Sequence, residues 1–177
     1  MRALLLFALS LTVAPQSAPA QAPPAPPAHV IAVYADLDST AALRAFVVLR
    51  TFAELHPGAA VVEIHVNPPD GRARAVDRAA IAARSLNAAL PMAELIAINH
   101  GQRTDDDFAG MVRQLGLDQA QFRKALDADG DAAVAEDVAA ASKLKLPRDV
   151  AVVIDGEPLR VPVTLTELEA RLIRSPG

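Results

Sequence analysis

The sequence of 177 residues contains no cysteine. Without a thiol the chain can form no disulfide, has no thiolate nucleophile, and offers no cysteine ligand to zinc or to an iron–sulfur cluster. Tryptophan is also absent, and aromatic residues make up only 3% of the chain. Hydrophobic residues nevertheless reach 52%, so we expect one domain with a core of aliphatic side chains and closely packed alanine.

Clustered positive charge is also lacking, because the formal net charge is −4 and lysine and arginine form no basic stripe. Binding to nucleic acid or to an anionic membrane surface requires clustered cations, so we expect neither as a partner. The eight glycines are scattered, and none of them forms a glycine-rich phosphate loop ahead of a helix.

The first twenty residues have the pattern of a secretory signal. Arg2 precedes an apolar run over residues 3–13, which is too short to span a bilayer, and Ala18 and Ala20 fit a cleavage site. A buried N-terminal helix is the alternative, but the proline-rich spacer that follows at 21–28 would break it. We therefore expect a periplasmic or secreted protein without a membrane anchor, whose mature chain carries a net charge near −5 after Arg2 is lost.

A strand–helix–strand unit opens the domain, which we expect to cover residues 29–174. The segment HVIAVYA at 29–35 is apolar on both faces, which is typical of a central strand. Ser39 or Asp38 can cap a helix whose apolar residues recur at helical spacing up to Ala53. The segment AVVEIHV at 60–66 is a second strand, so the order predicts a βαβ unit.

The middle of the chain has the periodicity of several helices, and the end returns to strands. Thr104 with Asp107, and Asp118 with Gln121, are typical of helix starts, and a further helix is expected over about 131–144. The segment VAVVI at 150–154 precedes Asp155-Gly156, a hairpin signal, and we expect residues 159–163 to pair with it. Thr164 and Glu167 then predict a last helix.

The acidic stretch at 127–131 has the spacing of a calcium loop in its first three acids. The required glycine and glutamate positions, however, hold Ala132 and Val138. We interpret the stretch as an acidic turn between helices, and we expect no metal and no cofactor.

The order of elements resembles the DsbA-like branch of the thioredoxin superfamily, and several short motifs carry that resemblance. The motifs are VYAD at 33–36, LGLD at 115–118 with Phe122 and Ala125-Leu126, the helix bearing Val134, Asp137, Ala141 and Leu144, and VVIDG at 152–156. The resemblance covers roughly residues 29–174. It implies an α/β thioredoxin-like fold with a helical insertion.

Two departures from the family pattern concern its redox chemistry. The family's Cys-x-x-Cys positions fall on Ser39, Thr40, Ala41 and Ala42, so both cysteines are replaced. The place of the family's cis-proline falls on Val150, and Pro147 lies three residues too early. Because a cis bond before a residue other than proline costs about 3 kcal/mol, we expect a trans bond before Val150.

The resemblance therefore implies a groove without catalytic residues, and we expect no enzyme activity. The candidate groove residues are Ser39, Thr40, Ala41, Ala42, Arg148, Asp149 and Val150. Ser39 could act as a nucleophile, but capping the helix is the simpler role because none of the four histidines is obviously placed to activate it. His65, in the second strand, is expected to be a packed structural histidine.

The sequence leaves three functions open. The first is a redox-inactive envelope module that binds an unknown peptide or protein partner. The second is a glutathione-linked transferase or isomerase that uses Ser39. The third is a non-catalytic subunit of a thiol-disulfide system whose cysteines are supplied by another chain.

Overall fold

The computed structural model describes residues 29–99, 104–128, 130–159 and 161–173. The predicted signal segment and proline-rich spacer lie outside the described residues. The elements in chain order are β1 (His29–Ala35), α1 (Thr40–Leu55), β2 (Ala60–Val66), α2 (Ala75–Arg84), α3 (Ala89–Ile98), α4 (Asp105–Gln114), α5 (Gln119–Leu126), α6 (Gly130–Lys143), β3 (Val150–Ile154), β4 (Glu157–Leu159) and α7 (Leu165–Leu172).

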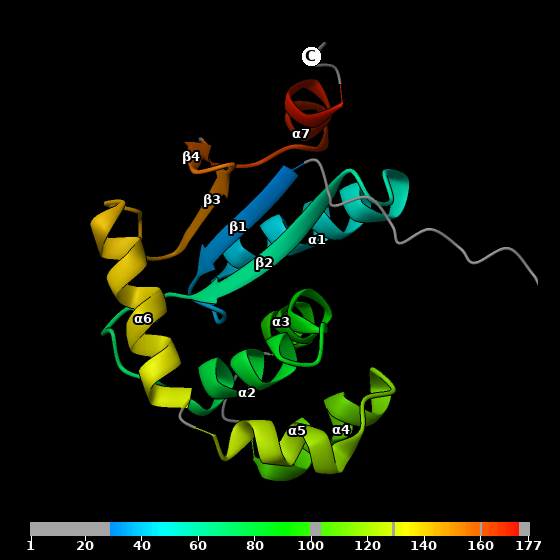
Figure 1. Ribbon diagram of the computed structural model, residues 1–177, viewed down its shortest axis with the longest axis vertical. Coiled ribbons are helices and arrows are strands. Elements are labelled where there is room, and N and C mark those ends of the chain that lie inside the picture. The colour runs from blue at the N-terminus through cyan, green and yellow to red at the C-terminus, as the bar shows by residue number, and fades with distance from the viewer. Residues whose placement is uncertain (1–28, 100–103, 129, 160, 174–177) are drawn as a thin grey trace, which may run out of the picture.

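A four-stranded sheet in the order β2-β1-β3-β4 organises these elements. β1 and β2 are parallel, with His29 opposite Ala60, whereas β3 is antiparallel to both β1 and β4. The predicted βαβ unit is thus present. Figure 1 shows α1 behind the sheet, α7 at one end of it, and the helices α2 to α5 gathered at the other end.

β1 is the central strand because it can be buried on both faces. Ile31 and Val33 are fully buried in the main core on the α1 side. Tyr34 on the opposite face packs with Ala141 of α6 and Val153 of β3 in a second, smaller cluster. A strand with apolar residues on both sides tolerates this double burial, and the apolar composition of 29–35 agrees with an inner place in the sheet.

Ser39 caps the start of helix α1, and its side chain accepts a hydrogen bond from the Ala42 N–H. The choice of Ser39 over Asp38 as the cap is therefore settled. The helix buries Phe46 and Phe52 against the sheet, at 0% and 1% exposure. Burying each such side chain contributes about 1.5–3 kcal/mol, so this face holds α1 in place.

The helical insertion comprises α2 to α6 and joins β2 to β3. Its central helix α2 is rich in alanine, and Ala79 and Ala83 are fully buried, which lets α3, α5 and α6 approach closely. Thr104 and Asp107 form a reciprocal capping box at α4, as predicted. Asp118 caps α5 by accepting from the Gln121 N–H at 2.7 Å.

The hairpin differs from the prediction in the position of its second strand. The strand expected at 159–163 lies instead at Glu157–Leu159. Asp155 and Gly156 both have positive φ, at 50° and 87°, which is the geometry of a two-residue hairpin turn. Such a turn starts the return strand at once, and Pro162, which has no N–H to donate, then lies beyond its end.

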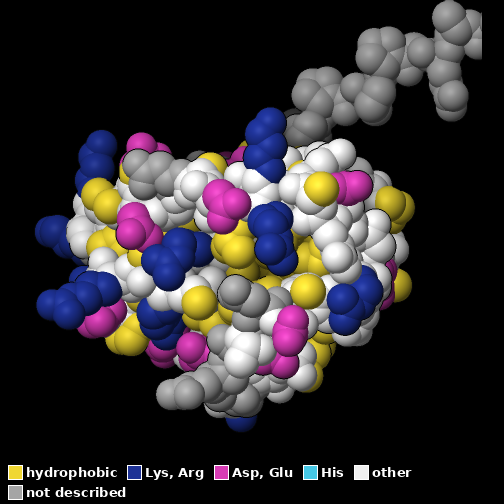
Figure 2. Space-filling model, turned by 90° about the horizontal axis from the view of Figure 1, so that it is seen from below, with side chains coloured by type: hydrophobic (Ala, Val, Ile, Leu, Met, Phe, Trp, Pro, Cys, Tyr) yellow, Lys and Arg dark blue, Asp and Glu magenta, His cyan; other side chains and the backbone are white. Residues whose placement is uncertain are grey.

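No helix in the described part of the chain combines the length and the apolar character needed to cross a membrane. Figure 2 shows the molecule from below, and acidic and basic side chains alternate on that face with apolar side chains between them.

Candidate functional site

The loop between β1 and α1 lies against the loop that enters β3. The Asp149 carbonyl oxygen accepts hydrogen bonds from the Asp36 N–H at 3.0 Å and from the Ser39 hydroxyl at 3.1 Å. The Ser39 oxygen also accepts from the Ala42 N–H at 3.0 Å. Two sequence stretches predicted to form one groove are therefore adjacent, and the Ser39 hydroxyl is used both as donor and as acceptor.

The other predicted groove residues divide into exposed and buried ones. Thr40 and Asp149 are exposed, and Ala41 is half-buried. Ala42 is fully buried, so its side chain belongs to the core and not to the surface of the groove. Val150 is 2% exposed and begins β3 opposite Ala35.

Arg148 contacts the end of β2. Its guanidinium donates to the Asn67 side-chain oxygen and to the Pro68 carbonyl, both at 3.3 Å. Asn67, which is 1% exposed, donates in turn to the Pro147 carbonyl at 3.1 Å. Arg148 therefore ties the loop before β3 to the end of β2.

A cavity of about 270 Å³ lies beside the predicted groove. Ala41, Asp149 and Val150, three of the candidate groove residues, line it. The sequence interpretation missed its other lining residues, which are Arg44, Ala45, Val161, Pro162 and Val163. The helical spacing of Arg44 from Thr40 could have indicated the first of these, since residues four apart share a helix face.

The backbone at this cavity contains a cis peptide bond between Val161 and Pro162. The bond before Val150 is trans, as expected. The sequence predicted a proline position beside the α1 N-terminus only in the segment before β3. In the structure, Pro162 reaches the cavity from the segment between β4 and α7.

A network of charges holds the β1–α1 loop from the side of the insertion. The Arg74 guanidinium contacts Asp36 at 2.8 Å, Asp38 at 3.2 Å and Asp77 at 2.9 Å. Asp77 is fully buried, and its hydrogen bonds are the largest cause of the raised pKa of Arg74. Arg74 thus joins the β1–α1 loop to the start of α2, and the sequence interpretation did not find this cluster.

A second polar cluster lies at the end of β2. The Asp137 carboxylate, 5% exposed, accepts hydrogen bonds from His65 Nδ1 at 2.7 Å, the Val66 N–H at 3.0 Å and Arg84 Nη1 at 3.0 Å. The His65 ring stacks on Tyr34 with centroids 4.6 Å apart. His65 is thus a packed structural histidine, as predicted.

A histidine paired with a buried aspartate can serve as a general base. The other ring nitrogen of His65, Nε2, lies 3.7 Å from the Glu63 carboxylate. Among the described residues, no serine or threonine hydroxyl is hydrogen-bonded to this ring. The pair joins β2 to α6, and Arg84 on α2 donates to the same carboxylate.

The insertion contains a further cavity, of about 460 Å³, between α4 and α5. Phe108, Val112 and Phe122 form its apolar wall, and Arg123 and Asp127 lie at its rim. Asp127 and Ala128 lie between the end of α5 and the start of α6, as interpreted, whereas Asp131 lies in the first turn of α6 and Asp129 is outside the described residues. Within the described ranges, no group of three or more histidine, aspartate or glutamate residues is arranged to hold a metal ion.

Comparisons with known proteins show which folds this chain resembles. No protein-family model and no curated sequence matches the chain. Solved structures do match it, each over 82% of the chain. A thioredoxin-like oxidoreductase from Silicibacter pomeroyi DSS-3 has 19% identity, a TM-score of 0.64 and 84% of its own chain covered. The thiol-disulfide exchange protein alpha-DsbA2 from Wolbachia pipientis has 12% identity, a TM-score of 0.68 and 81% covered.

A periplasmic thioredoxin-like protein from Salmonella enterica serovar Typhimurium matches with 17% identity, a TM-score of 0.60 and 82% of its chain covered. At these identities the similarity concerns the fold. The resemblance to DsbA-like proteins is confirmed at that level, and the segment Ser39–Ala42 lies at the start of α1, where the redox motif was expected. The chain is therefore a protein with the DsbA-like thioredoxin fold, built with its helical insertion between β2 and β3.

Proposed function

We propose that the chain is a redox-inactive module that binds a peptide or protein partner in the cavity beside the N-terminus of α1, the one lined by Ala41, Asp149 and Val150. The observation that carries this proposal is the state of Ser39. Its hydroxyl donates to the Asp149 carbonyl and accepts from the Ala42 N–H, so it is engaged in capping α1. The sequence holds no cysteine, and disulfide exchange requires a sulfur nucleophile.

The cleft has features that suit a peptide. Its floor is apolar, formed by Ala41, Ala45, Val150 and Val163, and a cation and an anion, Arg44 and Asp149, lie at the same opening. Val161, at 41% exposure, adds an apolar side chain at the rim. Pockets that combine apolar walls with a few polar groups are typical binding sites.

A glutathione-linked reaction at Ser39 is less well supported. A serine nucleophile needs a base within hydrogen-bond reach, and no described histidine is hydrogen-bonded to Ser39. A calorimetric titration with glutathione tests this alternative. Measurable binding of glutathione that Arg44→Glu weakens would favour this alternative over the peptide-binding function.

We also propose that the protein works in the periplasm or outside the cell. The apolar run at 3–13 and the small residues near Ala20 have the pattern of an export signal. One of the matched structures is described as a periplasmic protein. N-terminal sequencing of the protein from the cell envelope should find a start near Gln21, and a retained Met1 would contradict export.

Photo-crosslinking tests the binding function. A photoreactive residue at Thr40 or Arg44, in the full chain expressed in its own periplasm, should give a discrete adduct with a second protein. The same residue at Lys124, an exposed position on α5, is the matched control and should give none. Adducts that are absent from both cleft positions, or that are equal at Lys124, would overturn the proposal.

The redox part has a separate assay. The purified chain should neither reduce insulin nor refold a reduced substrate protein. Turnover by a preparation free of contaminating oxidoreductase would show that the redox-inactive description is wrong.

A further inference from the structure

The outer edge of β2 is divided into two halves with different hydrogen bonding. β2 is the edge strand of the sheet in the described chain. The Asn67 N–H turns toward β1 and binds the Ala35 carbonyl at 2.8 Å, whereas the Val66 N–H and the Ile64 carbonyl turn outward. Backbone groups alternate in direction along a strand, so the N–H and the carbonyl of Val62 also face outward.

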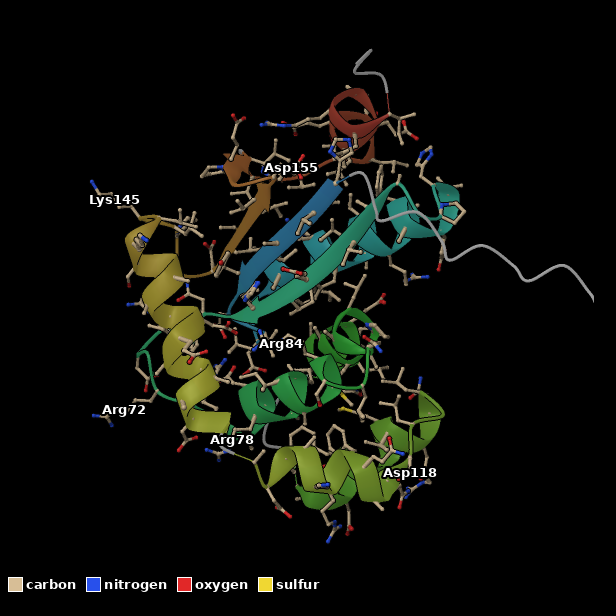
Figure 3. All side chains as sticks on the ribbon, viewed as in Figure 1. Arg72, Arg78, Arg84, Asp118, Lys145 and Asp155 are labelled. Atoms are coloured by element: carbon tan, nitrogen blue, oxygen red, sulfur yellow. The ribbon has the colours of Figure 1, made fainter. Side chains whose placement is uncertain are left out.

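Side chains of the insertion close the carboxy-terminal half of this edge. Asp137 accepts from the Val66 N–H at 3.0 Å, and Arg84 donates to the Ile64 carbonyl at 3.2 Å. The two side chains are themselves paired at 3.0 Å. Figure 3 shows Arg84 between the end of β2 and the insertion helices. A pairing strand therefore cannot extend past Ile64.

The amino-terminal half of the edge has no such closure. Within the described ranges, the outward backbone groups of Val62 have no hydrogen-bond partner. Unpaired edge groups of this kind are a template for another strand. Val61, with 42% exposure, presents an apolar side chain beside them.

A cleft of about 670 Å³ follows this part of the edge. Its far wall consists of the start of α3, at Ala89, Leu90 and Pro91, and of Glu136 on α6. This volume lies within the range of roughly 300–1,000 Å³ that is usual for ligand clefts. The cleft is separate from the one beside Ser39, with which it shares no lining residue.

The charges around the cleft select the occupant. Glu63, whose side chain is 49% exposed, and Glu136, which is exposed, lie at the rim, while Arg84 is already bound to Asp137. A second copy pairing edge to edge would bring both acidic rims together, which is unfavourable for like charges. A segment that carries lysine or arginine complements the rim.

We propose that the amino-terminal half of the β2 edge takes an extended, basic peptide segment of a partner protein as an added strand. The backbone groups of Val62 and the Ile64 N–H supply the hydrogen bonds, Val61 contacts an apolar side chain, and Glu63 with Glu136 contacts the cation. Main-chain pairing gives affinity in such complexes, and the side chains at alternate positions give specificity. The Arg84–Asp137 pair ends the added strand.

A set of labelled peptides tests the mode of binding. The probe is a fluorescein-labelled octapeptide that alternates valine with threonine and lysine, titrated with the full chain and followed by fluorescence anisotropy. Methylation of the peptide amides that face β2 removes the pairing donors and leaves the side chains unchanged, so affinity should fall at least ~10-fold. Replacement of lysine by glutamate should also weaken binding by ~10-fold or more.

Variants of the chain test whether the peptide binds at the β2 edge. Glu63→Lys should reverse the preference between the lysine and the glutamate peptides, and Glu54→Lys, an equal charge change on the exposed face of α1, should leave it unchanged. Val62→Pro removes an outward N–H, which edge strands tolerate, and should abolish binding. If Val62→Pro does not fold, hydrogen exchange on the unaltered chain replaces it, because the peptide should slow exchange at the amides of Val62 and Ile64.

Three results would overturn the proposal. The first is equal binding of the methylated peptide, and the second is unchanged exchange at Val62 and Ile64 in the presence of peptide. The third is a dimer in sedimentation equilibrium that Glu63→Lys alters, because that result assigns the edge to a second copy. None of these results bears on the crosslinks at Thr40 and Arg44, so this proposal and the proposed function can fail separately.

Discussion

Tyr34 is the single tyrosine of a chain without tryptophan, so its ionisation can be followed alone. Burial raises the pKa of Tyr34 above its usual value near 10, and the negative charges of Asp137 and Glu63 raise it further. Near-ultraviolet absorbance of tyrosinate should therefore titrate at higher pH in the folded protein than in denaturant.

The raised pKa has a consequence for stability. Because the folded-state pKa exceeds the unfolded one, Tyr34 contributes stability that is complete below about pH 10 and is lost as the pH rises through the folded-state pKa. Tyr34→Phe should remove this part of the alkaline destabilisation. Identical titration midpoints in the folded and denatured protein would contradict the burial of the hydroxyl.

Asp77 holds the Arg74 network from a fully buried position. Asp77→Ala should lower the free energy of unfolding by about 2–4 kcal/mol, somewhat below the loss for a fully buried pair because Arg74 keeps 29% exposure. Chemical denaturation measures this change. The control is Asp131→Asn, which removes an ion pair to Arg78 whose acidic side chain is 70% exposed, and it should cost less than ~0.5 kcal/mol. Equal losses in the two variants would contradict the role of Asp77.

At the scale of elements, helix α1 depends on its buried face. Phe46 has 0% exposure, and Phe46→Ala should destabilise the fold by about 3–5 kcal/mol, through lost burial and the cavity that remains. Val47, the next residue, is 39% exposed, and Val47→Ala should change stability by less than ~1 kcal/mol. Thermal or denaturant unfolding of both variants compares the two faces, and a change within ~0.5 kcal/mol for Phe46→Ala would contradict the assignment.

The elements differ in how far the sequence determined them. β1 and α1 were predictable because their apolar periodicity and the Ser39 cap are local features. The second hairpin strand was placed too late, because its start depends on the positive φ angles of Asp155 and Gly156. Turn geometry of this kind follows from the Asp-Gly dipeptide, so the sequence does contain the signal that sets the start of this strand.

The polar parts of the site were less predictable. Arg74 lies 36 residues from Asp38 in the sequence, and Asp137 lies 72 residues from His65. No periodicity connects residues so far apart, so their pairing is visible only in the fold. The same holds for Pro162, which reaches the α1 N-terminus from the segment after β4.

At the scale of the whole molecule, the fold can be tested by restoring its redox pair. Ser39→Cys with Ala42→Cys places two thiols three residues apart at a helix start, within bridging distance, and the helix N-terminus should lower the pKa of the first thiol. We expect a disulfide to form, with poor exchange of substrate disulfides. Thiol titration and redox equilibration with glutathione measure this. Failure of the two cysteines to join would contradict the thioredoxin-type arrangement.

Adding Val150→Pro to that pair should raise the exchange rate. The Asp36 N–H binds the Asp149 carbonyl beside the Ala35–Val150 pair, so Val150 itself is in a non-hydrogen-bonded position of the ladder. Proline there removes no hydrogen bond to β1. An unchanged or lower exchange rate in the triple variant would show that residue 150 does not shape substrate alignment in this protein.

The contact between Ser39 and Asp149 joins residues 110 positions apart in the sequence, and it bears on how the chain reaches its native state. During synthesis β1, α1 and β2 leave the ribosome well before β3, so the central strand waits with one side unpaired while five helices are made. Closing so long a loop is costly in entropy, and contacts of this range slow folding. We expect the β1–α1–β2 unit with its alanine-rich partner α2 to form first, and the docking of β3 to set the pace.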